Sequence, residues 1–138
     1  MTVTDVAAVV PALSHNAALN EKARVKAHSL DWLDPAGSSS LGQFDVILGA
    51  DIVWVNDLIR PMVRSMHALC TPESKVYFAY QSRSSSADEI LFGTLREYGF
   101  EWHVVPLEAL HPIFQSGKIA VYEMLLAKSG LSLESTEL

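Results

Sequence analysis

The sequence contains little cysteine and little basic charge. Its 138 residues include a single cysteine, Cys70, so no disulfide can form within the chain. Sixteen acidic residues outnumber ten basic ones, which gives a formal net charge of -6. Because nucleic-acid-binding domains usually present a basic face, this balance argues against a nucleic-acid partner. It leaves basic protein segments open as partners.

The sequence also lacks the hydrophobic runs of a membrane protein. No apolar run reaches the roughly 20 residues that a membrane-spanning helix needs. The N-terminus shows no basic region followed by an apolar core, so no signal peptide is predicted. We therefore expect no membrane partner and a cytoplasmic, or nuclear, location. Cys70 is predicted to lie late in a helix as a small core residue.

Motifs of metal and nucleophilic catalysis are missing as well. No two histidines have metal-ligand spacing on one helix face, and one cysteine cannot build a zinc site. The histidines are His15, His28, His67, His103 and His111. The serines lack the glycine-flanked setting of a nucleophile elbow, and no glycine-rich phosphate-binding loop is present. The sequence thus predicts neither a metal site nor a nucleophile mechanism.

What is present is the alternating pattern of an α/β domain. Hydrophobic residues make up 49% of the chain and recur at either strand or helix spacing. The expected strands cover residues 1–4, 23–30, 44–50, 75–81, 100–107 and 119–128, and the expected helices cover 6–17, 56–69 and 87–98. The order predicts an open, mostly parallel sheet that ends in an antiparallel hairpin, because no helix pattern separates the last two strands. Residues 1–128 are expected to form this domain, and 129–138 a flexible tail.

Several residues set the expected ends of these elements. Pro11 predicts a kink or a late start in the first helix. Asn56 is the expected N-cap of the second helix, with Pro61 in or near its first turn. Gly99 is the expected C-terminal cap of the third helix. Residues 34–43, rich in serine and glycine, are expected to form a loop.

The stretch FDVILGADIVW, from Phe44 to Trp54, is the most informative part of the chain. A short β-branched run bounded by glycine predicts a strand buried on both faces of a parallel sheet. Asp51 follows directly, at the carboxyl edge where open α/β sheets bind ligands. A carboxylate beside the Trp54 ring suits a polar, flat or cationic ligand. The alternative is that Asp51 only caps the following helix.

Two other strands also end in chemistry-bearing side chains. Asp5 is either the N-cap of the first helix or a ligand for the ribose hydroxyls of a nucleotide-like cofactor. Asp31 and Trp32 close the second strand, and Trp32 is either a core residue or a flat surface for a planar ring. In a parallel sheet these residues would share one edge with Asp51, as a cofactor cleft requires.

Four segments together resemble the seven-strand S-adenosylmethionine-dependent methyltransferases, in particular the protein-lysine methyltransferase group called methyltransferase family 16. TVTD at residues 2–5 is similar to the end of the family's second strand, and SLDW at 29–32 to that of the third. FDVILGADIVW is similar to the fourth strand and its motif, and GKIAVYEML to the final strand. The resemblance implies a Rossmann-like methyltransferase sheet, and it is most specific at residues 44–54.

The resemblance also implies roles for individual residues. Asp5 would bind the cofactor ribose, Asp31 and Trp32 would contact the adenine, and Ala50 would line the pocket for S-adenosylmethionine. Asp51 and Trp54 would form the acidic-x-x-aromatic motif beside the methyl acceptor, and act as its catalytic residues. The family usually has Tyr or Phe at the aromatic position; Trp54 keeps a π-face for an ammonium but lacks the phenol hydroxyl.

The implied function is methyl transfer to a lysine of a non-histone protein, of the chaperone or translation-factor type. The alternatives are a non-catalytic interaction module derived from a methyltransferase and a small-molecule methyltransferase. The family's first strand, glycine-rich turn and first helix have no counterpart before Thr2. We therefore expect an N-terminally truncated sheet, weak or no cofactor binding by the isolated chain, and open strand edges that would allow self-association.

Overall fold

The computed structural model describes residues 1–127, which fold into an α/β arrangement of six strands and four α-helices. The strands are β1 (Thr2–Asp5), β2 (Lys26–Ser29), β3 (Phe44–Ala50), β4 (Cys70–Tyr80), β5 (Phe100–Val104) and β6 (Ala120–Leu126). The α-helices are α1 (Val10–Ala18), α2 (Pro35–Ser40), α3 (Asn56–Ala68) and α4 (Ser85–Glu97). The expected tail, and with it the expected domain boundary, lies outside the described residues.

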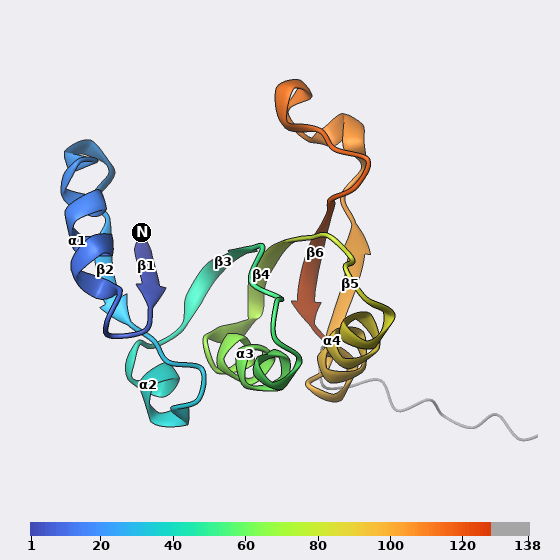
Figure 1. Ribbon diagram of the computed structural model, residues 1–138, viewed down its shortest axis with the longest axis horizontal. Helices are drawn as coiled ribbons and strands as arrows, with labels where there is room; N and C mark the ends of the chain where they lie inside the picture. The colour runs from blue at the N-terminus through green and yellow to red at the C-terminus, as the bar shows by residue number, and fades with distance from the viewer. Residues whose placement is uncertain (128–138) are drawn as a thin grey trace, which may run out of the picture.

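The strands form two sheets, as Figure 1 shows. In one, β1 pairs with β2 in parallel. The other has the order β3-β4-β6-β5, in which β3 and β4 are parallel and β6 is antiparallel to both of its neighbours. The predicted α/β fold with a C-terminal antiparallel hairpin is confirmed. The last strand lies inside the sheet, between β4 and β5.

The two sheets present unpaired edges on the described part of the chain. β1 is hydrogen-bonded to β2 alone, and β3 lies at the edge of its sheet. The prediction that β3 is buried on both faces is wrong, because Val46 is 53% exposed and Leu48 71% exposed. A strand with one neighbour and helices on one face only cannot bury both rows of side chains.

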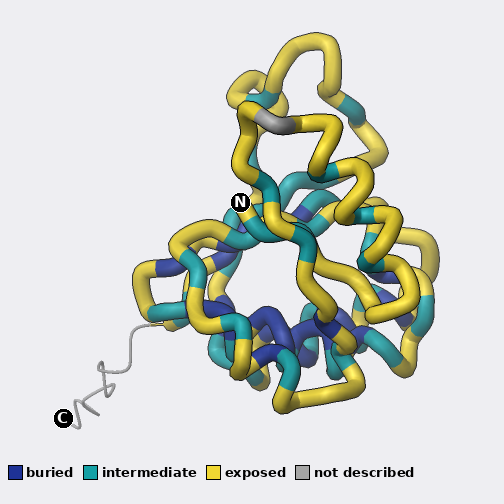
Figure 2. Tube along the Cα trace, turned by 90° about the vertical axis from the view of Figure 1, so that its left-hand side faces the viewer, coloured by how far each residue is buried: buried dark blue, intermediate teal, exposed yellow. Residues whose placement is uncertain are grey.

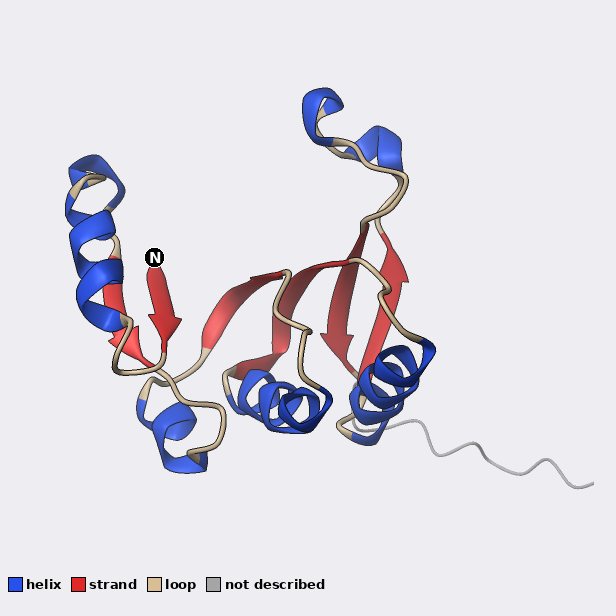
Figure 3. Cartoon of the chain, viewed as in Figure 1, coloured by secondary structure: helices blue, strands red, loops and turns tan. Residues whose placement is uncertain are grey.

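The core lies between the four-stranded sheet and two helices. In Figure 3, α3 and α4 lie against the same face of that sheet. Strand residues Val76, Phe78 and Met124 are at most 1% exposed, and Leu91 and Leu95 of α4 meet them. Figure 2 shows the buried positions gathered in one part of the molecule, while the projecting segments are exposed.

Residues 34–43 were expected to form a loop, and this prediction is wrong, since they contain α2. The carboxylate of Asp34 accepts a hydrogen bond from the Ala36 amide at 3.0 Å, so Asp34 is an N-cap. Pro35 follows at the first helical position, where its missing N–H costs nothing. Ser39 and Ser40 donate hydrogen bonds to backbone carbonyls one turn earlier. A short helix thus forms from residues that usually favour loops.

The other helices differ from the predictions in several details. α1 begins late, at Val10, with Pro11 in its first turn, as one reading of Pro11 predicted. The N-cap of α3 is Val55 rather than Asn56, and Pro61 lies inside this helix, just after its first turn. Cys70 is buried as expected, but it opens β4 instead of ending a helix. None of the helices in residues 1–127 is long and apolar enough to cross a membrane.

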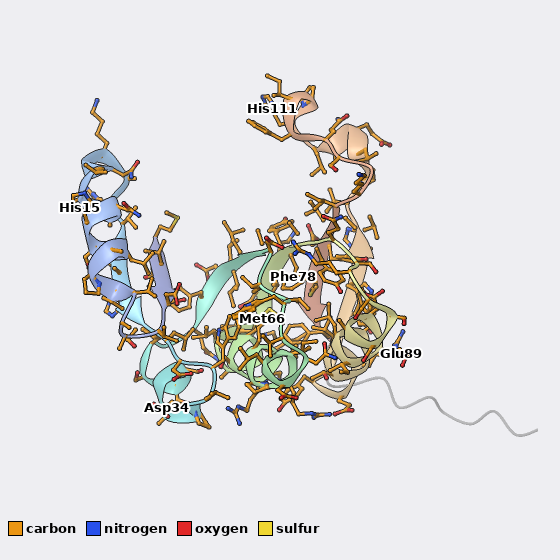
Figure 4. All side chains as sticks on the ribbon, viewed as in Figure 1. His15, Asp34, Met66, Phe78, Glu89 and His111 are labelled. Atoms are coloured by element: carbon orange, nitrogen blue, oxygen red, sulfur yellow. The ribbon has the colours of Figure 1, made fainter. Side chains whose placement is uncertain are left out.

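The connection between β5 and β6 projects from the body, at the upper right of Figure 1. It carries two short 3₁₀ turns, and Figure 4 places His111 near its far end. Ile113 and Phe114 are 79% and 78% exposed. Figure 4 places Met66 and Phe78, by contrast, within the body between sheet and helices.

Candidate functional site

A cavity of about 610 Å³ lies between the two sheets, where the ends of three strands meet α3. Its wall includes every residue that the sequence proposed for the site: Asp5, Asp31, Trp32, Ala50, Asp51 and Trp54. The strand-end rule therefore brings together side chains that are up to 49 positions apart in the sequence (54 minus 5). The roles assigned to these residues stay predictions.

Asp5 ends β1 and faces the cavity as a surface carboxylate. Its Oδ1 accepts a hydrogen bond from the Val6 amide at 2.7 Å. The N-cap of α1 is Val9, and no side chain caps that helix, so the capping alternative for Asp5 is wrong. The local bond fixes one carboxylate oxygen and orients the group at the strand end.

Asp31 and Trp32 form the next part of the wall, after β2. Oδ1 of Asp31 accepts a hydrogen bond from the Leu33 amide at 2.9 Å, which holds the turn. The Trp32 carbonyl accepts a hydrogen bond from Nη2 of Arg64 at 2.8 Å, and this ties the turn to α3. The Trp32 ring is half-buried and packs against the core while it lines the cavity. The core reading of Trp32 is thus supported by its packing, and its contact with a planar ring stays a prediction.

Asp51 stands at the turn that follows β3. Its φ is 54°, in the left-handed region that few residues other than glycine, asparagine and aspartate adopt. Its amide donates to the Ala79 carbonyl at 3.3 Å, which extends the pairing with β4 by one residue. The alternative that Asp51 caps α3 is wrong, because Val55 is the N-cap and no side chain caps that helix. The carboxylate is left at the cavity rim.

The Asp51 carboxylate has a cationic partner that the sequence reading did not identify. Nη2 of Arg83 lies 2.6 Å from its Oδ1. Arg83 follows β4, the neighbour of β3, so the rule that placed Asp51 at the carboxyl edge could also have placed Arg83 there. Three residues beyond Asp51, the Trp54 ring is 73% exposed. Asp51 is therefore paired with a cation and also lines the cavity to which Trp54 belongs.

The floor of the cavity is apolar except for one hydroxyl. Met62, Met66 and Leu69 of the α3 region line it, together with Ile47 of β3. Ser65 is 2% exposed, and its Oγ has no hydrogen-bond partner among the described residues. Apolar walls with a few convergent polar groups are typical of sites for organic ligands. This donor set fits a ligand that has a flat ring and several hydroxyl groups.

The loop that carries Arg83 is held by a small polar network. Tyr80 and Ser82 each donate a hydrogen bond of 2.6 Å to the carboxylate of Asp88, one to each oxygen. The bond from Ser82, and then that from Tyr80, lowers the pKa of Asp88. Burial, with the bond to Asp88, raises the pKa of Tyr80 to about 12. The network fixes both ends of the short loop from Tyr80 to α4.

The part of the chain that the structure describes contains no group of three or more His, Cys, Asp or Glu side chains that could hold a metal ion. The carboxylates that line the cavity, Asp5, Asp31 and Asp51, come from the ends of three separate strands, and the hydroxyls of Thr4 and Ser65 line it as well. Such a set suits hydrogen bonding to an organic molecule.

A family model described as lysine methyltransferase matches residues 1–97. The chain belongs to this family. The curated mouse protein "Protein N-lysine methyltransferase METTL21A" is 32% identical over 89 residues, which cover 60% of this chain and 40% of the mouse protein. The chain therefore spans well under half the length of that relative.

Solved structures show the same fold at low sequence identity. An O-methyltransferase family protein from Burkholderia thailandensis has a TM-score of 0.68 at 12% identity, covering 94% of this chain and 44% of that one. Human N-acetylserotonin methyltransferase, solved in complex with SAM, has a TM-score of 0.61 at 14% identity, covering 91% of this chain and 40% of that one. The predicted Rossmann-like methyltransferase fold is confirmed. Family and fold together support S-adenosylmethionine as the cofactor.

Proposed function

We propose that the protein transfers a methyl group from S-adenosylmethionine to a lysine side chain of another protein. The observation that carries this proposal is that Asp5, Trp32 and Asp51 line the same cavity. Membership of the lysine methyltransferase family supports the type of acceptor. We further propose that the acceptor is a non-histone protein of the chaperone or translation-factor type. The reaction would take place in the cytoplasm or the nucleus.

The cavity residues divide into those that would hold the cofactor and those that would meet the acceptor. Asp5 would accept hydrogen bonds from ribose hydroxyls, since a carboxylate binds a diol through both oxygens. Trp32 would stack on the adenine, with Asp31 beside it. Ala50 has a small side chain at the cavity wall, which leaves room for the ligand. The bound cofactor would supply an electrophilic methyl group on a sulfonium.

Asp51 and Trp54 suit the chemistry of the acceptor. A lysine must lose its proton before its nitrogen lone pair can attack, and the product is again a cation. The ammonium proton would pass to solvent, and the amine nitrogen would then accept the methyl group as the C–S electron pair stays on sulfur, which leaves as a neutral thioether. The Asp51 carboxylate and the Trp54 π-face would stabilise the positive charge that develops on nitrogen. Holding the amine in line with the methyl group supplies much of the remaining rate enhancement.

The test is methyl transfer from labelled S-adenosylmethionine to candidate proteins, with the modified residue located by mass spectrometry. We expect a labelled lysine, and at least tenfold less label with Asp51→Asn, since one electrostatic contact in a transition state is worth on the order of 10²-fold. Asp57→Asn is the matched control, because Asp57 is an exposed carboxylate in the first turn of α3 away from the cavity wall. It should leave the rate unchanged.

The same assay separates the alternatives. Label on a free amine alone would indicate a small-molecule acceptor. Specific binding of a protein without transfer would indicate an interaction module. An active Asp51→Asn variant would contradict the role of this carboxylate.

A further inference from the structure

We propose that Arg83 reads the charge beside the target lysine, so that the acceptor segment carries an aspartate or glutamate next to that lysine. The inference depends on the proposed function for the identity of the incoming side chain. Arg83 would thus help to select the acceptor, and the acceptor would have an acidic residue next to its lysine. Its physical basis is an exchange of ion-pair partners at the cavity rim.

The pair that must be exchanged is well defined. Arg83 Nη2 and Asp51 Oδ1 are 2.6 Å apart, and the two side chains are 58% and 75% exposed. The partners come from the ends of adjacent parallel strands, β3 and β4. Both are open to an approaching protein, and Trp54, which lines the same cavity as Asp51, is also exposed.

An incoming lysine ammonium meets a carboxylate that already has a cation. Arg83 occupies Oδ1 of Asp51, so an ammonium that binds the same carboxylate brings a second cation next to the guanidinium, and their repulsion weakens the ion pair with Arg83. The guanidinium is always charged, and its five donors match a carboxylate in a planar, bidentate fashion. A carboxylate on the acceptor would therefore compensate for the weakened ion pair.

The neighbouring acid of the protein is a poorer alternative for Arg83. Asp88 has each of its carboxylate oxygens engaged by a hydroxyl, from Tyr80 and from Ser82, at 2.6 Å. Binding Arg83 there would require a rearrangement of that network. An acidic residue on the acceptor needs no such change, because Arg83 is already more than half exposed.

The experiment measures peptide binding directly rather than methyl transfer. Three peptides are titrated into the full chain at matched ionic strength: acetyl-Glu-Lys-Glu-amide, acetyl-Gln-Lys-Gln-amide and acetyl-Arg-Lys-Arg-amide. The readout is the indole N–H signal of Trp54 in a ¹H–¹⁵N spectrum, assigned with Trp54→Phe. We expect the acidic peptide to bind about two- to fivefold more tightly than the neutral one, the range that an exposed ion pair supplies.

Variants at Arg83 give the sharper result. Arg83→Ala should remove the preference, and Arg83→Glu should reverse it in favour of the arginine-flanked peptide. The matched control is Arg60→Glu, because Arg60 makes an equally short ion pair of 2.6 Å with Glu97, with both side chains 57% exposed. This variant has the same net charge as Arg83→Glu and should keep the preference for the acidic peptide.

Each outcome decides the matter. Reversal in Arg83→Glu but not in Arg60→Glu supports the proposal. Equal changes in both variants would show a general charge effect and overturn it, as would no Trp54 signal change with any lysine peptide. If the preference is found but no methyl transfer occurs, the proposed function fails while the reading of acceptor charge by Arg83 stands.

Discussion

Gly49 offers the most exacting test of how β3 positions the site. This residue lies in β3 two positions before Asp51, and it faces the core. A Cβ added there would lie 3.0 Å from Cδ1 of Ile52 and 3.1 Å from Cδ2 of Phe78. The Ile52 methyl is the end of a flexible side chain and can move, but the Phe78 ring is 1% exposed and is held by the core. Gly49→Ala should therefore displace the end of β3.

The expected magnitude follows from two opposing effects. Overpacking a core position costs about 1–3 kcal/mol. Replacing glycine in a strand recovers about 0.5–1 kcal/mol, because the unfolded chain has less entropy to lose. We expect Gly49→Ala to lower the free energy of unfolding by about 1.3 kcal/mol, the difference between the midpoints of the two effects, and by at most about 2.5 kcal/mol.

Urea unfolding followed by tryptophan fluorescence measures this change, and Gly93→Ala is its matched control. Gly93 lies inside α4 with nothing within 4 Å of an added Cβ. The same methyl group should therefore stabilise the protein at this position by about 0.5–1 kcal/mol. If Gly49→Ala proves as stable as the parent, or if both variants shift in the same direction, the close approach at β3 does not control packing as argued.

Three further predictions concern buried groups. Burial raises the pKa of the Tyr80 hydroxyl from its ordinary 10.0 to about 12. The stability that the neutral hydroxyl contributes is therefore complete below pH 10 and is lost as the pH rises through 12. Tyr80→Phe should flatten this fall in the free energy of unfolding. Burial raises the pKa of Cys70 to about 11, so its thiol should resist thiol reagents at neutral pH and react once urea unfolds the chain, whereas fast labelling of the native protein would contradict the burial. Leu95 is 0% exposed, so Leu95→Ala should lower the free energy of unfolding by about 2–5 kcal/mol in the same urea assay. A loss below about 1 kcal/mol would show that α4 is loosely packed.

The site was more predictable from the sequence than its surroundings. Asp5, Trp32 and Asp51 each follow a β-branched or alternating run, and parallel strands bring their carboxyl ends to one edge. The pattern therefore specified which side chains would meet. The ion pair of Asp51 with Arg83 was missed because strand patterns give neighbours in a sheet but not the reach of a long side chain.

The wrong predictions about the fold have identifiable physical causes. β3 is apolar on both rows of side chains, which predicts burial, yet its exposure depends on whether a strand pairs with its second edge. α2 was missed because Gly37 and the serines after it favour loops, while the cap from Asp34 and the proline after it favour a helix. Cys70 was assigned to a helix because hydrophobic spacing continues from α3 directly into β4. In each case a tertiary or capping contact decided between two local patterns.

The most direct test of the central claim uses the three tryptophans of the chain. Trp32 and Trp54 line the cavity, whereas Trp102 packs against Phe92 with Arg96 over its ring, 5.2 Å from the centroid. S-adenosylmethionine is titrated to millimolar concentration while the three indole N–H signals are followed by ¹H–¹⁵N spectroscopy. The signals of Trp32 and Trp54 should shift together along one binding curve, and that of Trp102 should stay in place. A stationary Trp32 signal, or equal shifts of all three, would contradict a cofactor site between the two sheets.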